Sequence, residues 1–493
     1  MSLIQTDHLT FTHEGNAEPV FDGLSMQLDT DWKTGVIGRN GRGKTTFLRL
    51  LHGDFAYSGG IYMNVACDYF PFPVDNPGRP TAQLIQTFVP AGEEWQLERE
   101  LNLLEVSPDV LERPFAALSG GEQTKVLLAA LFLREDHFLL IDEPTNHLDR
   151  HAREVVSRYL RRKHGFLLVS HDRAFLDGCV DHILSFERTG VKIQRGNYSS
   201  WNENRQRQEQ FERSQDRKLR KDISRLEAAA ARTSNWSDKM EKTKRGTRNS
   251  GLRPDTGYIG HRSAKMMKRS KAIEARQQAA IDEKSQLLHN MEQAPPLRLS
   301  PLRYCVETLA ELKQVSIRYD GRDICCPVDL TISRGDCVAL VGKNGAGKSS
   351  LLKLLCGAPV DYSGRLYIGS GLRISYVPQD TSFLTGGLES FACQRGIDRS
   401  LFYTILRKLD FSRTLFEQDM RTYSAGQKKK VLLAASLCEQ AHLYLWDEPL
   451  NYIDIDSRIQ IEELLKQYRP TMLLVEHDRA FCDAVAARTV ELV

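Results

Sequence analysis

Two short segments of the chain place glycines, a lysine and a hydroxyl in the same order. Residues 38–45 read GRNGRGKT and residues 342–349 read GKNGAGKS. Closely spaced glycines let backbone N–H groups wrap around phosphate oxygens, and a helix that starts there adds about half a positive charge. The lysine can neutralise terminal phosphates, and the hydroxyl can bind magnesium. The pattern predicts two binding sites for a magnesium-bound nucleotide, and we call these segments the first and second P-loops.

Each P-loop stands where an apolar strand passes into a helix. The runs 34–37 and 337–341 precede the loops, and the helix-forming runs 47–51 and 351–355 follow them. A phosphate-binding loop requires this context, so two chance glycine-rich turns are a poor explanation. The predicted nucleotide contacts are Gly38, Asn40, Gly41, Gly43, Lys44, Thr45, Thr46, Gly342, Asn344, Gly345, Gly347, Lys348, Ser349 and Ser350.

An apolar strand ends in two carboxylates in each half of the chain. These pairs are Asp142–Glu143 and Asp447–Glu448. The first carboxylate of a pair can hold magnesium, directly or through water, and the second can activate a water that attacks a γ-phosphate. The predicted magnesium ligands from the pairs and the P-loops are Thr45, Asp142, Ser349 and Asp447. Hydrolysis of ATP is therefore the predicted reaction, with Glu143 and Glu448 as its catalytic carboxylates.

The motifs recur at matching intervals. A serine followed by small residues opens an aliphatic helix pattern at residues 118–123 and again at 423–428. From the P-loop lysine to this serine the spacing is 75 residues in the first half and 76 in the second, and from the serine to the first carboxylate it is 23 in both. Matching offsets of this kind identify an internal repeat. The chain therefore contains two copies of the same motif arrangement.

The combination of motifs resembles ABC ATPases, over roughly residues 1–195 and 305–493. The resemblance implies an α/β fold in each half and a head-to-tail sandwich, in which each ATP lies between the Walker motifs of one cassette and the signature of the other. It implies signature contacts from Ser119, Gly120, Gly121, Ser424 and Gly426. It also implies D-loop aspartates at Asp149 and Asp454, catalytic switch histidines at His171 and His477, and a magnesium and nucleotide contact from Gln379.

Two aromatic residues occupy similar places ahead of the P-loops. His13 and Tyr319 can each supply a face for adenine, or each can be an ordinary strand residue. Both readings stay open from the sequence.

The two composite sites are not equal. We call site 1 the Walker residues of the first cassette with the signature of the second, and site 2 the reverse. Phe72 stands in site 1 where Gln379 stands in site 2, and Ala425 replaces a signature glycine, which adds a Cβ where backbone approaches phosphate. The sequence predicts slower ATP hydrolysis at site 1, although neutral local variation is the alternative.

Composition is that of a globular protein, with 41% hydrophobic and 27% charged residues. The longest apolar runs, such as residues 126–133, are far shorter than the roughly 20 residues needed to cross a bilayer. The amino terminus lacks a basic segment followed by an apolar one. A cytoplasmic monomer, with its two cassettes paired within the chain and no transmembrane partner, is the expectation.

The middle of the chain carries the positive charge. Residues 201–290 hold 22 Lys and Arg against 12 Asp and Glu. The stretches 201–230 and 264–291 have helical character, and Pro295 and Pro296 end the second. The pattern predicts a long antiparallel α-helical hairpin, which divides the chain into domains at 1–195, 196–300 and 301–493, with the hairpin tip near 242–265.

The hairpin tip is strongly basic. Residues 242–271 contain ten Lys and Arg and one acid, together with glycines and Tyr258. Such a segment suits phosphate-rich RNA, with Tyr258 able to stack on an unpaired base, whereas a solvated basic loop is the plain alternative. The predicted RNA or tRNA contacts are Lys244, Arg245, Arg253, Tyr258, His261, Lys265, Lys268 and Arg269.

Tandem cassettes joined by a two-helix linker resemble the ABC-F proteins. Residues 249–254, 257–261 and 265–270, with Tyr69–Phe72 and Trp446–Asp454, look like the antibiotic-resistance members of the Lsa/Vga type. The resemblance implies a ribosome protection protein that enters the E site of the bacterial 70S ribosome with ATP bound. Its linker would reach the P-site tRNA and the 23S rRNA of the peptidyl-transferase centre, and would displace lincosamide, pleuromutilin and streptogramin A antibiotics.

Two other functions stay open from the sequence. A housekeeping ABC-F translation factor would relieve stalled ribosomes without conferring resistance. The ATPase subunit of a membrane transporter would share the cassettes, but it has no need of a basic arm between them.

Overall fold

The computed structural model describes residues 2–14, 19–86, 88, 94–134, 136–187, 190–243, 268, 275, 297–319, 322–324 and 326–492. The chain divides into two compact units. Unit 1 joins Met1–Trp201 with Pro295–Val493, and unit 2 is Asn202–Ala294. Both predicted cassettes therefore lie in unit 1.

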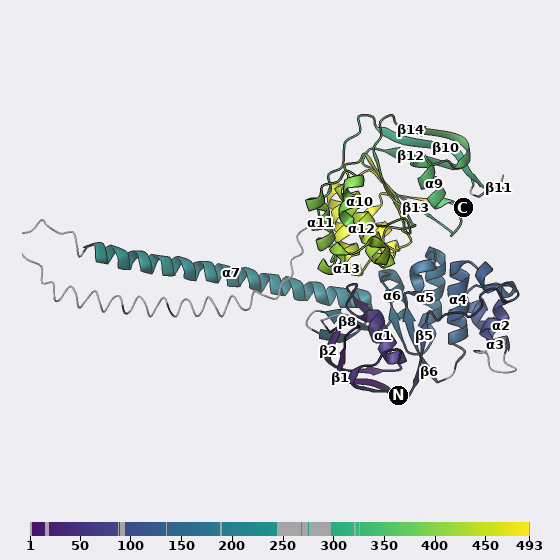
Figure 1. Cartoon of the computed structure of the whole chain (residues 1–493), viewed down its shortest axis with the longest axis horizontal. Helices are drawn as coiled ribbons and strands as arrows, with labels where there is room; N and C mark the ends of the chain where they lie inside the picture. The colour runs from purple at the N-terminus through teal and green to yellow at the C-terminus, as the bar shows by residue number, and fades with distance from the viewer. Residues whose placement is uncertain are drawn as a thin grey trace, which may run out of the picture. The chain divides into compact units, whose positions relative to one another are not determined.

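The first half of unit 1 is built on a parallel sheet (Figure 1). Its strand order is β5-β6-β7-β3-β8-β9, in which only β9 pairs antiparallel. The strands are β3 (Lys33–Gly38), β5 (Ala66–Phe70), β6 (His137–Asp142), β7 (Phe166–Val169), β8 (His182–Glu187) and β9 (Gly190–Arg195). A three-stranded antiparallel sheet accompanies it, formed by β1 (Leu3–Phe11), β2 (Phe21–Asp29) and β4 (Ser58–Tyr62).

The helices of the first half are short. They are α1 (Lys44–His52), α2 (Thr81–Ile85), α3 (Glu94–Leu103), α4 (Gly120–Leu131), α5 (Arg150–Arg161) and α6 (Arg173–Cys179). Strand residues alternate between two cores, because successive side chains point to opposite faces of a sheet. Leu139 and Ile141 of β6 belong to the core that includes residues of α4. Phe138 and Leu140 belong to the core that includes residues of α1.

The second half repeats this plan. Its parallel sheet has the order β15-β16-β17-β13-β18, and its antiparallel sheet joins β11, β10 and β12, with β14 on β10. The strands are β10 (Thr308–Tyr319), β11 (Arg322–Asp323), β12 (Val328–Ser333), β13 (Cys337–Gly342), β14 (Asp361–Ile368), β15 (Ile374–Val377), β16 (Leu443–Asp447), β17 (Met472–Val475) and β18 (Arg488–Leu492). The helices are α9 (Lys348–Leu355), α10 (Leu388–Gln394), α11 (Arg399–Lys408), α12 (Ala425–Cys438), α13 (Ile455–Tyr468) and α14 (Arg479–Val485).

Both P-loops connect a central parallel strand to a helix, as the sequence predicts. The residue before each helix is a glycine in the left-handed region, with φ 87° at Gly43 and 83° at Gly347. A Cβ at Gly43 would also lie 2.5 Å from the Val20 side chain. Glycine is therefore required there for both backbone and space.

Unit 2 begins within a long helix. Helix α7 (Tyr198–Thr243) has 46 residues, which corresponds to about 69 Å at 1.5 Å per residue. Phe211 on this helix is 62% exposed. The second arm predicted at 264–291 lies outside the described residues, apart from Lys268 and Ala275, which are both helical and exposed. None of the helices described is long and apolar enough to span a membrane.

Candidate functional site

The lysine of each P-loop folds back over its own loop. The Lys44 ammonium donates to the carbonyls of Gly38 at 2.6 Å and Arg39 at 3.0 Å. Lys348 makes the equivalent pair of bonds at 2.9 and 2.8 Å. Both side chains are buried, and burial lowers the pKa of each. The two charges are held where phosphate oxygens would meet them.

The proposed magnesium ligands of the first half lie together. The Thr45 hydroxyl donates to Oδ2 of Asp142 at 2.7 Å, and the Tyr69 hydroxyl donates to the same oxygen at 2.9 Å. The other oxygen of this buried carboxylate, Oδ1, has no hydrogen-bond partner among the described residues. A buried carboxylate oxygen without a partner costs free energy unless a cation or donor satisfies it. The donor set thus fits Mg²⁺, which uses one or two protein oxygens together with nucleotide phosphates.

In the second half the corresponding carboxylate is Asp447, at the end of β16. Its side chain is fully buried, and burial raises its pKa to about 6. Ser349 lines the adjoining cavity with Gln379. A cation at this place would offset the burial of the Asp447 charge.

The catalytic carboxylate predicted for site 1, Glu143, is close to the switch histidine of its own domain. Oε1 of Glu143 lies 3.2 Å from Nε2 of His171, which is itself 3.2 Å from Oδ1 of Asn40. Burial and the neighbouring charge of Asp142 raise the pKa of Glu143 to about 8. Burial and the charge of Lys44 hold the pKa of His171 well below its usual range. Both shifts favour the uncharged forms of this pair, a protonated Glu143 beside a neutral His171 imidazole.

The carboxylate of the second half is held by three side chains. Oε1 of Glu448 lies 3.4 Å from Nε2 of His477, and the amides of Gln379 and Asn451 each donate to Oε2 at 2.7 Å. Burial raises the pKa of Glu448, but the bond and charge of His477, the bond from Gln379 and the charge of Lys429 together lower it below its usual value. Glu448 is therefore ionised at neutral pH, in contrast to Glu143.

Phe72 is a second difference between the two sites. Its ring packs against the helical core, with its centroid 4.9 Å from that of Phe88. Gln379, at the matching position of the second half, donates to Glu448 instead. The first half thus places an apolar ring where the second places an amide donor.

The two halves contact each other reciprocally through their P-loops. The Asn40 amide donates to the carbonyl of Tyr452 at 2.9 Å, and the Asn344 amide donates to the carbonyl of His147 at 3.2 Å. The backbone N–H of Asn344 also donates to Oδ2 of Asp149 at 3.3 Å. Each P-loop therefore lies against the segment that follows the carboxylate pair of the other half.

A cavity of about 340 Å³ is lined by residues of the second P-loop and by Gly120 of the first signature. From the first half it is lined by Gly120, Asn146, His147 and Leu148. From the second half it is lined by Ile324, Asn344, Gly345, Gly347, Lys348, Ser349, Ser350, Gln379, Glu448 and His477. The cavity thus brings Gly120 together with five residues that the sequence predicts for site 2, namely Lys348, Ser349, Gln379, Glu448 and His477. The other predicted members, Ser119, Gly121 and Asp447, are not among its lining residues.

The signature serines begin the two helices that follow them. Ser119 accepts a bond from the Glu122 N–H and caps α4, and Ser424 accepts one from the Gln427 N–H and caps α12. The hydroxyls thus stand at helix N-termini, which favour an anionic ligand.

Comparison with known proteins supports the fold of the two halves. A family model described as ABC transporter matches residues 74–146 and 325–451. The structure of the archaeal ribosome recycling factor aABCE1, in complex with the ribosomal stalk protein aP1, has a TM-score of 0.63 and 21% identity, and covers 98% of this chain and 87% of that one. A structure of RNase-L Inhibitor gives a TM-score of 0.62 with 21% identity and the same coverage of both chains.

The chain contains two tandem ABC ATPase domains. The fold predicted for the two halves is thereby confirmed. Such domains bind ATP, normally with Mg²⁺.

Curated relatives match along nearly the whole chain. The ribosome protection protein VmlR of Bacillus subtilis is 28% identical over 488 residues, which are 96% of this chain and 84% of that protein. The ATP-binding protein Uup of Caulobacter vibrioides is 29% identical over 490 residues, which are 97% and 75% of the two chains.

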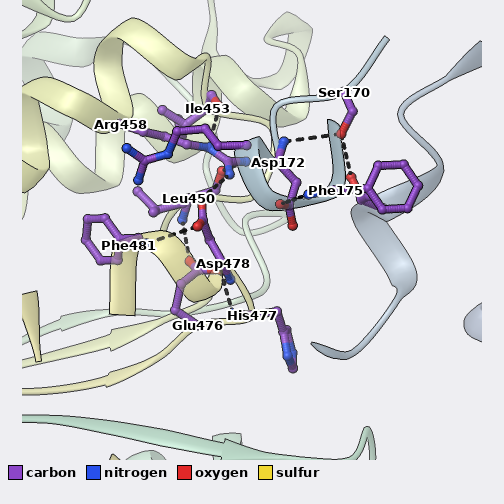
Figure 2. Close-up of polar contacts among 12 residues, drawn as sticks. Ser170, Asp172, Phe175, Leu450, Ile453, Arg458, Glu476, His477, Asp478 and Phe481 are labelled. Atoms are coloured by element: carbon purple, nitrogen blue, oxygen red, sulfur yellow. Dashed lines mark hydrogen bonds and ion pairs between the residues drawn. The ribbon is translucent and has the colours of Figure 1, made fainter. Parts of the chain in front are cut away.

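The loops that carry the switch histidines are fixed by buried ion pairs in both ABC ATPase domains. Arg153 pairs with Asp172 at 2.9 Å, and Arg458 pairs with Asp478 at 3.0 Å. Figure 2 shows the second pair, with Arg458 also donating to the Leu450 carbonyl at 2.9 Å. The aspartate after each histidine is therefore tied to the helix that follows the D-loop.

These loops differ at the residue before the histidine. Glu476 accepts from the N–H of His477 at 2.7 Å and of Leu450 at 3.2 Å (Figure 2). Ser170, its counterpart, accepts from the N–H of Asp172 at 3.2 Å. A carboxylate thus braces the switch loop of the second ABC ATPase domain, where a hydroxyl does so in the first.

His13 and Tyr319 both reach the helix that follows the P-loop. Nε2 of His13 lies 3.2 Å from the Thr46 hydroxyl, and the Tyr319 hydroxyl lies 3.0 Å from that of Ser350. Both rings therefore lie beside the P-loops, and their part in adenine binding stays a prediction.

Most of the predicted RNA contacts lie outside the described residues. They are Lys244, Arg245, Arg253, Tyr258, His261, Lys265 and Arg269. Lys268 is described, and it is helical and exposed.

Sequence reasoning missed Tyr69 and Asn451. Asn451 follows Glu448 by three residues, at the same offset as Asn146 from Glu143, so the repeat carried a signal for it. The signal for Tyr69 is weaker. Tyr69 aligns with Tyr376 in the second half, but this match alone does not predict a bond to Asp142.

Proposed function

We propose that this chain hydrolyses ATP at both composite sites and acts on the bacterial ribosome while ATP holds the two domains together. The observation that carries the proposal is the reciprocal contact of Asn40 with Tyr452 and of Asn344 with His147. It supports a sandwich in which each nucleotide needs both domains. The similarity to the ribosome protection protein VmlR supports the ribosome as the partner.

Glu448 acts as the general base at site 2. Its ionised carboxylate accepts a proton from the attacking water, and the amides of Gln379 and Asn451 orient it. Lys348 neutralises phosphate charge, and Ser119 with Gly120 closes the site from the other domain. Magnesium neutralises the phosphates when it is bound, and Ser349, Asp447 and Gln379 would hold it there.

Site 1 uses the equivalent groups, but its general base has a raised pKa. Glu143 is the base and His171 its partner, with Thr45 and Asp142 as the groups that would hold magnesium. Because Glu143 is mostly protonated at neutral pH, it accepts a proton poorly. Ser424 and Gly426 complete the site. Site 1 therefore turns over more slowly than site 2.

The two sites should differ in pH dependence. In the Glu448→Gln variant, only site 1 retains its base, and the raised pKa of Glu143, about 8, makes the rate increase as pH rises. We expect roughly a tenfold increase between pH 7 and 9. In Glu143→Gln the rate should stay nearly flat, because the pKa of Glu448 lies below its usual value. Steady-state phosphate release across this range measures both profiles, and two identical profiles would contradict the assignment.

The finer proposal is ribosome protection of the Lsa/Vga type within the ABC-F proteins. The ATP-bound chain enters the E site, and its basic linker acts at the P-site tRNA and the 23S rRNA to displace lincosamides, pleuromutilins and streptogramin A compounds. The excess of 22 basic over 12 acidic residues at 201–290 supports an RNA-directed linker.

Two alternatives remain as outcomes of experiment. A housekeeping translation factor shares the same sites and would bind ribosomes without changing drug tolerance. A transporter subunit would instead associate with membranes. The relatives include the Bacillus subtilis protein YfmR, whose name reads uncharacterized ABC transporter ATP-binding protein, at 25% identity.

Ribosome sedimentation tests the proposal. The double variant Glu143→Gln, Glu448→Gln should bind ATP without hydrolysing it, so with ATP it should pellet with 70S ribosomes in near-stoichiometric amount. With ADP it should stay in the supernatant, because the sandwich then lacks the γ-phosphates that bridge the domains. A further Lys44→Ala, Lys348→Ala change provides the matched control without nucleotide. Recovery with membranes, and absence from ribosomes, would overturn the proposal.

A further inference from the structure

Lys429 is a buried lysine to which the proposed mechanism assigns no part. It lies on α12, five residues after the signature serine Ser424, and is 2% exposed. Its ammonium donates to the carbonyl of Pro378 at 2.8 Å and to that of Asp447 at 3.0 Å. A buried ammonium requires such acceptors, so the side chain is fixed to both backbone segments.

Both acceptor residues are next in sequence to a side chain of site 2. Pro378 precedes Gln379, whose amide donates to Glu448. Asp447 precedes Glu448 itself. A displacement of the Lys429 ammonium would therefore move Pro378 and Asp447, and with them the neighbouring Gln379 and the general base Glu448.

The amino end of the same helix belongs to site 1. A Cβ on Gly426 would lie 2.6 Å from the carbonyl of Tyr452, so the backbones are in close contact there. That carbonyl accepts the bond from Asn40 of the first P-loop. Helix α12 thus spans from the signature side of site 1 to the backbone that holds site 2.

The first ABC ATPase domain has a different group at this position. Thr124 lies five residues after Ser119, and its hydroxyl donates to the Gly120 carbonyl at 2.9 Å within α4. A threonine side chain bonded to its own helix does not tie that helix to a neighbouring loop. The connection made by Lys429 therefore has no matching side chain at Thr124.

We propose that Lys429 is a positioning residue that couples the state of the signature at site 1 to turnover at site 2, a link that Thr124 does not make in the first domain. The inference rests on the proposed ATP hydrolysis. When Ser424 engages a nucleotide, α12 shifts as a rigid body, and Lys429 carries the shift to Pro378 and Asp447. Free energy is lost if the carbonyl of Pro378 or Asp447 is left buried without its donor. Helix α12 and these two backbone segments therefore move together.

A double-mutant cycle tests this coupling. All variants carry Glu143→Gln, so that ATP hydrolysis reports site 2. Ser424→Ala is then made with Lys429 present and with Lys429→Thr, which copies the first domain. We expect Ser424→Ala to lower kcat about fivefold with Lys429 present and less than twofold with Lys429→Thr, since couplings of this kind are typically fivefold or more. A merely structural lysine would leave the Ser424→Ala effect unchanged.

Controls separate folding from coupling. Thr124→Val at the matching position should leave the Ser424→Ala effect at about fivefold. Lys429→Met, which keeps an unbranched side chain without a donor, is the second variant if Lys429→Thr loses its thermal unfolding transition. Equal Ser424→Ala factors with Lys429 and with a folded Lys429 variant would overturn the inference.

A second readout separates this inference from the proposed function. If the parent chain hydrolyses no ATP, the proposed function fails, and the cycle is read from the affinity for a fluorescent ATP analogue in the presence of Mg²⁺. Loss of the Ser424→Ala effect on that affinity in Lys429→Thr would still support the coupling, and its persistence would contradict it.

Discussion

Replacing Glu448 by glutamine should lower the steady-state rate of ATP hydrolysis by roughly 10- to 100-fold, whereas Glu143→Gln should lower it less than twofold. The reason is the different state of the two carboxylates. Glu448 receives two amide bonds of 2.7 Å and is ionised, while burial and Asp142 raise the pKa of Glu143 to about 8. Site 2 therefore carries most of the turnover.

Phosphate release at saturating ATP and Mg²⁺ measures both variants. Glu187→Gln is a suitable control for the loss of one carboxylate, because Glu187 is an exposed residue that pairs with Lys192. Its rate should match the parent. An equal or larger loss from Glu143→Gln than from Glu448→Gln would contradict the unequal sites and would favour Phe72 and Ala425 as neutral variation.

Deleting residues 246–260 should abolish drug tolerance while leaving ATP hydrolysis within about twofold of the parent. The segment is the centre of the basic stretch 242–271, and the P-loops and carboxylate pairs lie far from it in sequence. The deletion removes Tyr258 with Arg248 and Arg253. A stacking ring and positive charge supply affinity for unpaired RNA, so we expect the loss of this part of the tip to end the action at the ribosome. Growth of a lincosamide-sensitive bacterium at increasing lincomycin concentration measures the effect.

Tyr258→Ala is the finer version of this deletion. It removes a ring without changing charge, so it should reduce tolerance while keeping ATP-dependent sedimentation with ribosomes. If neither the intact chain nor the deletion variant confers drug tolerance, only the housekeeping function is left. Tolerance that the intact chain confers and the deletion keeps would assign it to another part of the chain.

The P-loops and the repeat could be predicted from the sequence because their geometry is local. A glycine at Gly43 or Gly347 is dictated by its own left-handed φ, and strand and helix signals lie within a few residues of it. The pairing of the parallel strands was not predicted, since the order β5-β6-β7-β3-β8-β9 joins segments that are far apart along the chain.

The sequence by itself thus determined the two phosphate-binding loops, the carboxylate pairs and the matching halves, each of which is written in short, spaced patterns. Only the tertiary structure decided which carboxylate is ionised. Glu143 and Glu448 are the same residue type at the same motif position. Burial and the charge of Asp142 raise the pKa of Glu143, whereas His477 and Gln379 lie beside Glu448 and lower its pKa. The same holds for Lys429, because burial and hydrogen bonding to distant backbone are properties of packing and not of the local sequence.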